Sequence, residues 1–182
     1  MRLPWGRLQS RFAPLKVLCH LKIVKKSALI QKIIAKLDAE LELYAKSARA
    51  AHEEATHEQS KAENKYDTRG LEASYLAHGQ SRQAAETLQA RSEFAALQAR
   101  DFVAGDPIDV GAVVELEEAD SSALYFIGPR AGGTEIVHQK KTVLVITPQS
   151  PLGSQLLGRK QGERLSVEIG GARRDYRIAR VA

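Results

Sequence analysis

Apolar residues in the first half of the chain recur at alternating steps of four and three, which is the spacing of a coiled-coil seam. The stretch is rich in Ala, Leu, Glu, Lys and Gln, and no proline occurs between Pro14 and Pro107. We predict a long helix that begins near Ser27, with Ser27 as its N-cap. The predicted seam positions are Ile30, Ile34, Leu37, Leu41, Tyr44, Ala48, Ala51 and Ala55.

A second helical segment is predicted after a break at residues 65–70, where Gly70 is a suitable turn residue. Its apolar positions are less regular: Leu71, Tyr75, Leu76, Ala84, Ala85, Leu88, Phe94, Ala95 and Leu97. Because the two arms are nearly equal in length, we predict an antiparallel two-helix hairpin that folds about residues 67–68. This register places Leu41 near Phe94. The seam residues shrink to alanine towards the turn, which predicts a slender, weakly stabilised far half.

After residue 101 the composition shifts to Gly, Pro, Val and Ile, which is typical of a β domain. Ser150, Pro151 and Gly158 have the spacing of an N-cap, a first helical residue and a C-terminal stop. The predicted fold class is α+β: a coiled-coil hairpin over residues 27–100, then a small antiparallel β domain with one short helix over 101–182. The strand-like runs are 110–116, 123–127, 141–146, 164–169 and 175–181.

The net charge of +5 is unevenly distributed along the chain. Residues 1–26 contain seven basic residues and no acid, so residues 27–182 together carry a charge of −2. The basic composition therefore does not indicate a nucleic-acid-binding body. Three interpretations of residues 1–26 stay open: a start upstream of the native one, which would lie near Val24 or Lys25, a flexible basic arm, or a targeting segment.

Three carboxylates lie close to the predicted turn, at Glu63, Asp67 and Glu72. Carboxylate oxygens suit a hard divalent cation, but this set is too small for a tight site alone. It would instead complete the coordination of a metal that a partner holds. The alternative is that these residues are ordinary polar turn residues.

No self-contained active site is recognisable in the sequence. His52 and His57, in the run HEEATHE, are five residues apart and so do not share one helix face, unlike the histidines of an HExxH zinc site. The single cysteine, Cys19, excludes a disulfide framework within the chain. There is no P-loop, GxGxxG or GxSxG motif. We therefore expect an accessory or binding protein rather than an enzyme.

Residues 150–162 read SPLGSQLLGRKQG, which resembles the SPLGxxLLGxxxG signature of the bacterial Gre-type transcript cleavage and elongation factors (GreA/GreB-like). The flanking runs 143–148 and 176–178 lie where that family has strands. The predicted order, a helical hairpin followed by an FKBP-like β domain, is also similar. The resemblance covers residues 27–182.

The resemblance implies that the chain binds RNA polymerase through the secondary channel and stimulates cleavage of backtracked RNA. Asp67, Glu63 and Glu72 would act in trans at the hairpin tip, with Asp67 and Glu63 sharing a Mg²⁺ in the polymerase site. The protein would need no cofactor of its own. The tip diverges from the family, because residues 63–66 (ENKY) match its ENxEY run with one residue missing. A channel-binding regulator without cleavage activity is therefore the alternative.

The resemblance also leads us to expect a cytoplasmic monomer with no membrane segment and no stable nucleic-acid site of its own. Two other functions stay open: a dimerising coiled-coil scaffold and a prolyl isomerase. Few aromatic side chains are available for the proline pocket that the second would need. Candidate residues for docking on an acidic partner surface are Arg159, Lys160, Arg173 and Arg174, although a solvated face would look the same.

Overall fold

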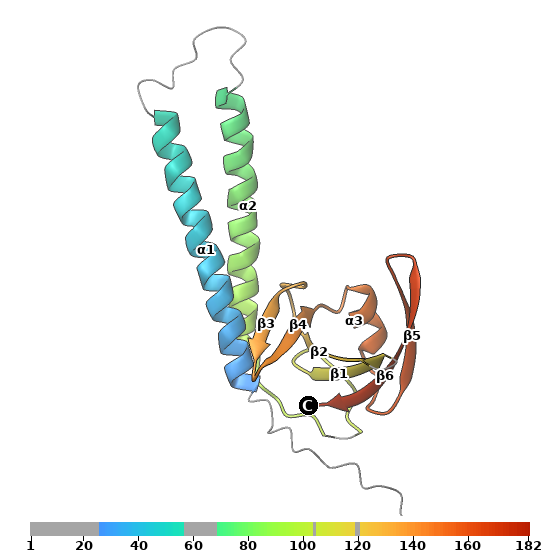
Figure 1. Ribbon diagram of the computed structural model, residues 1–182. Coiled ribbons are helices and arrows are strands. Elements are labelled where there is room, and N and C mark those ends of the chain that lie inside the picture. Colours follow the sequence, from blue (N-terminus) through green and yellow to red (C-terminus); the bar gives the residue numbers. More distant parts are fainter. Residues whose placement is uncertain (1–25, 57–68, 104, 119–120) are drawn as a thin grey trace, which may run out of the picture.

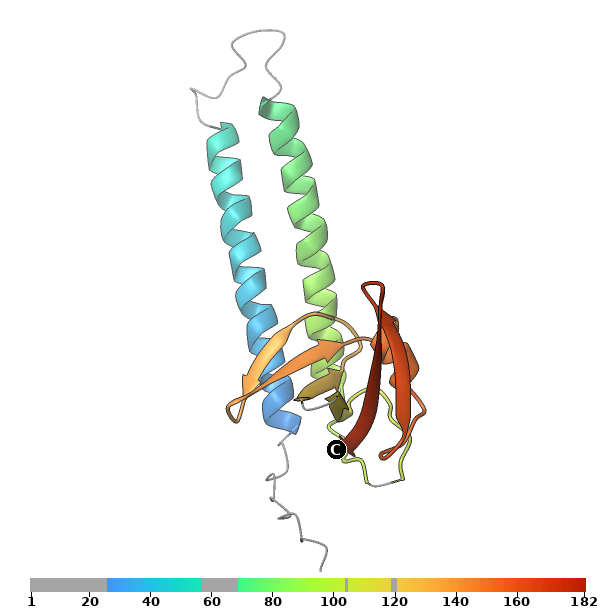
Figure 2. The ribbon, with the colours of Figure 1, turned by 45° about the vertical axis from the view of Figure 1, so that its right-hand side comes forward.

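The computed structural model describes residues 26–56, 69–103, 105–118 and 121–182, with backbone only at 54–56, 69–74 and 169. Two long helices, α1 (Lys26–Thr56) and α2 (Arg69–Ala96), precede a six-stranded sheet and one short helix, α3 (Pro151–Leu156). The helices stand side by side and project from one side of the sheet domain (Figures 1 and 2). The predicted α+β architecture is confirmed. The strands are β1 (Val113–Glu118), β2 (Ser121–Ile127), β3 (Glu135–His138), β4 (Lys141–Ile146), β5 (Arg164–Ile169) and β6 (Ala172–Val181).

The ends of both helices differ from the predicted ones. α1 already includes Lys26, so Ser27 lies inside the first turn and is not the N-cap. α2 begins at Arg69, so Gly70 is its second residue rather than a turn residue. A glycine is tolerated there because the first turn of a helix lacks full intrahelical hydrogen bonding in any case.

The register of the hairpin also differs from the predicted one. Asp38 and Arg91 form an ion pair between α1 and α2, and their midpoint in the sequence lies between residues 64 and 65. The hairpin therefore does not fold symmetrically about 67–68. Phe94 belongs to the same buried cluster as Leu37, and Leu41 is not a member of it, so the cluster does not support the predicted contact between Leu41 and Phe94.

The sheet has the strand order β3-β4-β2-β1-β6-β5. All pairs are antiparallel except β2–β4, which is parallel, with Leu124 opposite Val143. β3, a four-residue strand that follows Gly133 and lies at the edge of the sheet, is not among the predicted strands. The predicted cap of α3 is confirmed: the Ser150 side chain accepts from the Gly153 N–H, Pro151 opens the helix, and Gly158 follows it at φ 78°.

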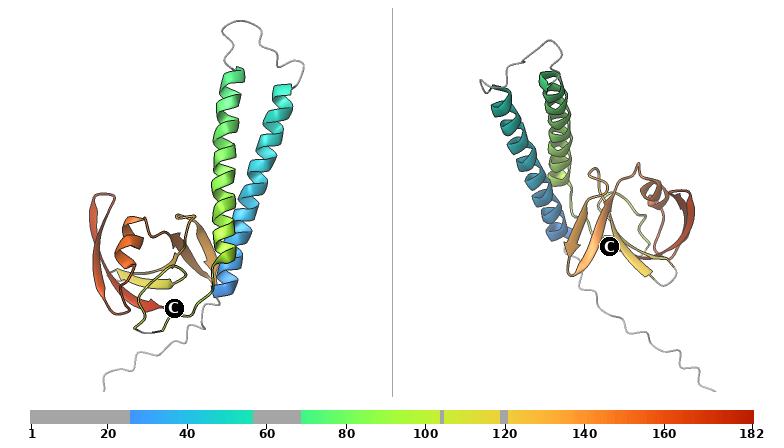
Figure 3. Two further views of the ribbon diagram at one scale, coloured as in Figure 1. Left: turned by 180° about the vertical axis from the view of Figure 1, so that it is seen from behind. Right: turned by 45° about the horizontal axis from the view of Figure 1, so that its top comes forward.

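Apolar side chains form two clusters, one on each face of the sheet. The first lies between the sheet and α3 and includes Leu152, Leu156 and Ile178. The second joins the base of the hairpin to the opposite face of the sheet (Figure 3). Its members are Leu29, Ile30, Ile33, Leu37, Ala90, Phe94, Val113, Leu124, Phe126, Ile136, Val143 and Val145.

The second cluster explains why the hairpin base is more apolar than its far end. Leu29 and Ile33 lie off the predicted seam and are fully buried. Burial of a side chain of this size contributes about 1.5–3 kcal/mol. Phe94 stacks on Phe126 with ring centroids 6.2 Å apart. The base of the hairpin and the β domain therefore share one core, whereas the described side chains of the far half of the hairpin belong to neither cluster.

Candidate functional site

The predicted tip residues are only partly within the described chain. Glu63 and Asp67 lie outside the described residues. Glu72 lies in the first turn of α2, where only the backbone is described. Their roles in trans and the shared Mg²⁺ therefore stay predictions. The structure does describe the contacts that fix the orientation of the α1–α2 hairpin on the β domain.

Two lysines of α1 bind the edge strand of the sheet. The Lys32 Nζ donates to the Val137 carbonyl at 2.9 Å, and the Lys36 Nζ donates to the Glu135 carbonyl at 3.2 Å. These carbonyls belong to β3, which has a neighbouring strand on one side only. The lysines occupy outward carbonyls that an edge strand would otherwise leave free. They also fix the helix along the strand.

α2 is attached to the domain by a separate ion pair. The Arg130 Nε donates to the Glu93 Oε1 at 2.7 Å, and the Gln89 amide donates to the same oxygen at 3.0 Å. The hydrogen bond from Arg130 is the largest cause of the lowered pKa of Glu93. Together with the α1 lysines and the shared core, this pair sets the orientation of the hairpin on the domain.

At the base of the hairpin, two cations stack on one aromatic ring. The Lys26 Nζ and the Arg100 guanidinium each lie 4.3 Å from the centroid of Phe102. Lys26 is buried and donates a hydrogen bond to the Arg100 carbonyl. Burial lowers the pKa of Lys26 to about 8, although Asp101 opposes the shift. This cluster links the start of α1 to the segment that leaves α2.

A buried histidine lies at the end of β3. His138 is buried, and neither ring nitrogen has a hydrogen-bond partner in the described part of the chain. Burial lowers its pKa, and the charge of Lys32 lowers it further. A neutral imidazole therefore fits this position better than a charged one. No pattern in the sequence indicates this burial, because His138 has no neighbour at ligand spacing.

The SPLG segment has a structural explanation of its own. The Ser150 Oγ donates to the Thr147 carbonyl at 2.8 Å and accepts from the Gly153 N–H at 3.0 Å. A Cβ on Gly153 would lie 2.0 Å from the Thr147 carbonyl oxygen, so no other residue fits there. Leu152 is buried, and Leu157 is partly buried against the same cluster.

The four predicted docking cations do not lie together. Arg174 lies on the same side of β6 as the buried Tyr176, and its guanidinium pairs with Glu118 at 3.2 Å. Glu118 is also the largest cause of the raised pKa of Arg174. Arg173 lies on the opposite side of β6, because successive residues of a strand alternate between faces. A groove there is lined by Arg159 and Arg173, and by Arg164 and Arg177, which the sequence analysis did not select.

The HEEATHE segment gives no evidence for a metal site. His52 lies in α1 with an exposed side chain, and His57 lies outside the described residues. In the described ranges, no group of three or more His, Cys, Asp or Glu side chains is placed to hold a metal ion. Among those same residues, no helix is long and apolar enough to span a membrane.

Comparison with known proteins identifies the second half of the chain. Residues 103–182 match the family model described as "Transcription elongation factor, GreA/GreB, C-term". Residues 103–182 are therefore similar to the C-terminal domain of GreA/GreB transcription elongation factors. The chain is 37% identical over 84 residues to the transcription elongation factor GreA of Desulfovibrio desulfuricans, a match that covers 45% of this chain and 48% of that protein. It is 26% identical over 98 residues to GreA of Streptococcus suis, covering 52% of this chain and 57% of that protein.

These matches span only about half the length of the GreA proteins concerned. Solved structures that resemble this chain include the GreA factor homolog 1 (Gfh1) of Thermus thermophilus. That protein is 20% identical, with a TM-score of 0.34, over 82% of this chain and 94% of that one. Gfh1 of Thermus aquaticus is 22% identical, with a TM-score of 0.36, over 85% of this chain and 94% of that one.

Proposed function

We propose that this chain is an accessory factor of RNA polymerase: its β domain docks on the enzyme and its hairpin enters the secondary channel. The observation that carries the proposal is the GreA/GreB match of residues 103–182, in a chain whose other half is a long hairpin fixed to that domain. The proteins it matches are transcription elongation factors by name. The polymerase would perform the chemistry, and this chain would modify it.

The shape of the hairpin supports insertion into a narrow passage. α1 has 31 residues, which corresponds to roughly 45 Å at 1.5 Å per residue. Only its first turns, up to Leu37, contribute to the core shared with the sheet. Beyond Leu37 the predicted seam continues with Leu41 and Tyr44 and then only with alanines, so the far part of the arm is thin. An arm of this kind adds little stability to its own domain and is suited to contacts with another molecule.

The acidic residues near the turn would supply the effect on catalysis. Glu63 and Asp67 would help to hold a Mg²⁺ in the polymerase site, with Glu72 as a third carboxylate. A second metal in such a site activates the attacking water or stabilises the leaving oxygen. These residues would act in trans, since the protein contributes oxygen ligands and the polymerase supplies the metal.

A second candidate is a channel-binding regulator that does not stimulate cleavage. The observation that favours it is the tip sequence, in which residues 63–66 match the family's ENxEY run with one residue missing. Docking and insertion depend on the β domain and the described helices, so they would survive this divergence. Only the metal chemistry would be lost.

Site-specific photocrosslinking tests the proposed partner. Tyr75 lies in α2 with 71% of its side chain exposed, so a photoreactive amino acid there leaves the shared core intact. With core RNA polymerase present, we expect crosslinks to the walls of the secondary channel. The matched position is Val137 on β3, which is 66% exposed and lies on the domain, and it should not reach those walls. Crosslinks from Tyr75 to a second copy of the chain, or none to polymerase, would contradict the proposal and favour a scaffold.

A further inference from the structure

The outer face of the β5–β6 hairpin carries an open groove lined by four arginines, which we call the arginine groove. Its volume is about 590 Å³. Arg164 comes from β5, Arg173 and Arg177 come from β6, and Arg159 comes from the segment after α3. Two carboxylates, those of Glu117 and Asp175, also line it. The groove therefore carries an excess of positive charge.

The arginines of the groove are unequally neutralised. Arg177 lies 3.4 Å from Glu117, and Arg159 lies 3.6 Å from Glu163. Arg173 lies 3.7 Å from Asp175, but both side chains are 77% exposed, so solvent screens this pair strongly. The guanidinium of Arg164 has no ion pair within the described residues. It is available to an external carboxylate.

The pairing of the strands sets two of these cations against each other. Arg164 on β5 lies directly opposite Arg177 on β6. Like charges at directly opposed positions destabilise a sheet, whereas Glu at either position would stabilise it. The stability of the β5–β6 hairpin therefore does not explain why Arg164 and Arg177 lie opposite each other. A negatively charged ligand bound in the groove would explain this arrangement.

We propose that the arginine groove is a docking site for an acidic segment of a protein partner. Guanidinium groups bind carboxylates through two parallel hydrogen bonds, so several arginines can recognise separate Asp or Glu side chains. Glu117 and Asp175, placed among the arginines, would repel a continuous polyanion such as a nucleic-acid backbone. They are compatible with a peptide whose acidic residues are interrupted by other side chains. The charge of −2 on residues 27–182 opposes nucleic-acid binding further.

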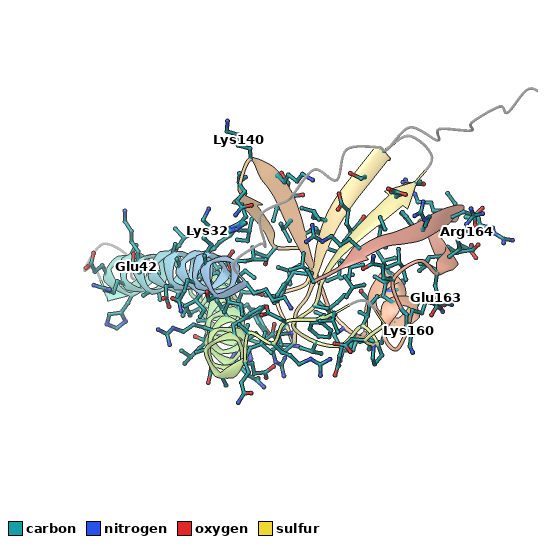
Figure 4. All side chains as sticks on the ribbon, turned by 90° about the horizontal axis from the view of Figure 1, so that it is seen from below. Lys32, Glu42, Lys140, Lys160, Glu163 and Arg164 are labelled. Atoms are coloured by element: carbon teal, nitrogen blue, oxygen red, sulfur yellow. The ribbon has the colours of Figure 1, made fainter. Side chains whose placement is uncertain are left out.

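The position of the groove is compatible with simultaneous use of the hairpin. β5 is the edge strand at the end of the sheet away from β3, which α1 covers. In Figure 4, Arg164 lies at the opposite end of the domain from Lys32 and the helices. A partner seated in the groove would hold the β domain and leave both helices free. If the proposed function is correct, this partner segment belongs to RNA polymerase; that identification, unlike the groove chemistry, rests on the proposed function.

The test compares the charge reversal Arg164→Glu with Lys140→Glu, a matched reversal at the exposed turn of the other edge hairpin. The probes for fluorescence anisotropy are a labelled glutamate-rich peptide with interspersed serines and an RNA oligonucleotide of the same formal charge. We expect Arg164→Glu to weaken peptide binding about tenfold or more, since close charge pairs at interfaces contribute 1.5 kcal/mol or more. Lys140→Glu should leave it within about twofold of the wild type. Arg164→Gln, which only removes charge, should give a smaller loss with unchanged thermal stability.

Any of three results would overturn the proposal. Arg164→Glu and Lys140→Glu could weaken peptide binding equally, Arg164→Glu could leave peptide binding unchanged, or the RNA could bind more tightly than the peptide. A parallel titration with core RNA polymerase separates it from the proposed function. If polymerase binds the wild type and Arg164→Glu equally, the groove is not the docking site, and the proposed function is unaffected. If polymerase does not bind the wild type but Arg164→Glu still loses the peptide, the groove proposal stands without the proposed function.

Discussion

Asp38 of α1 and Arg91 of α2 form a 2.7 Å ion pair across the hairpin, in which the Arg91 Nε donates to the Asp38 Oδ1. Both side chains are about half exposed, so the pair contributes little stability by itself. In a double-mutant cycle with Asp38→Asn and Arg91→Gln, we expect a coupling free energy of about 0.2–1 kcal/mol from chemical denaturation. No coupling at low salt would contradict the register described here.

Gly79 lies within α2 at a position where no neighbouring atom requires a glycine. A Cβ at this position would meet no atom within 4 Å, and the residue is helical. Gly79→Ala should therefore stabilise the hairpin by about 0.5–1 kcal/mol, because alanine loses less backbone entropy on folding. Hydrogen exchange of the α2 amides measures this change.

The matched control is Gly133→Ala. It also has open space around the new Cβ, but φ there is 90°. This substitution should destabilise the domain, because an L-residue is strained in that conformation. If both glycine substitutions moved stability in the same direction, the backbone explanation would be wrong.

Gly153 should not tolerate any side chain. A Cβ would lie 2.0 Å from the Thr147 carbonyl oxygen and 2.9 Å from the Ser150 Oγ, which caps α3. Gly153→Ala must therefore displace α3 from the first cluster, and we expect a loss of several kcal/mol, as in other cases of strain and overpacking. Thermal unfolding measures it, with Ser154→Ala as a control on the exposed side of the same helix. A melting temperature equal to that of the wild type would contradict the tight approach.

Lys26 makes the stability of the hairpin base dependent on pH. Burial lowers its pKa in the folded protein from 10.5 to about 8. Between these values the unfolded chain binds the proton that the folded chain has released. The free energy of unfolding should therefore rise as the pH increases from about 8 towards 10.5. Lys26→Met, which has no titrating amine, should remove this rise.

The measurement is thermal unfolding of both proteins at pH values from 7 to 10, reported as the difference between them so that other titrating groups cancel. An unchanged difference across that range would show that Lys26 keeps an ordinary pKa.

The hairpin was largely predictable from the sequence, because its four-three spacing has a single physical cause. Ile30 and Leu37 are buried where that spacing placed them. Leu29 and Ile33 were missed because they face the sheet, and a seam pattern cannot reveal a second contact surface. The predicted register was wrong because it assumed two arms of nearly equal length, whereas the sequence midpoint of the Asp38–Arg91 ion pair lies between residues 64 and 65.

The β domain was also predictable only in part. The cap of α3 was predictable, since Ser150, Pro151 and Gly158 each have a local conformational role. β3 was not, because Glu135–His138 is short and is stabilised by pairing with β4 and by two distant lysines. Of the four arginines in the arginine groove, the sequence analysis selected only Arg159 and Arg173 as docking candidates. Arg164 and Arg177 become neighbours through strand pairing, which no local pattern in the sequence shows.

Cleavage of RNA in a backtracked transcription complex tests whether the hairpin tip acts in the polymerase site. The length of the transcript is followed with and without the full chain, in the presence of Mg²⁺. We expect faster RNA shortening with the wild type, and loss of that stimulation in the combined variant Asp67→Ala and Glu63→Ala, with polymerase binding retained. Binding without stimulation by the wild type would favour the non-cleaving regulator, and undiminished stimulation by the double variant would contradict the proposed role of the hairpin tip.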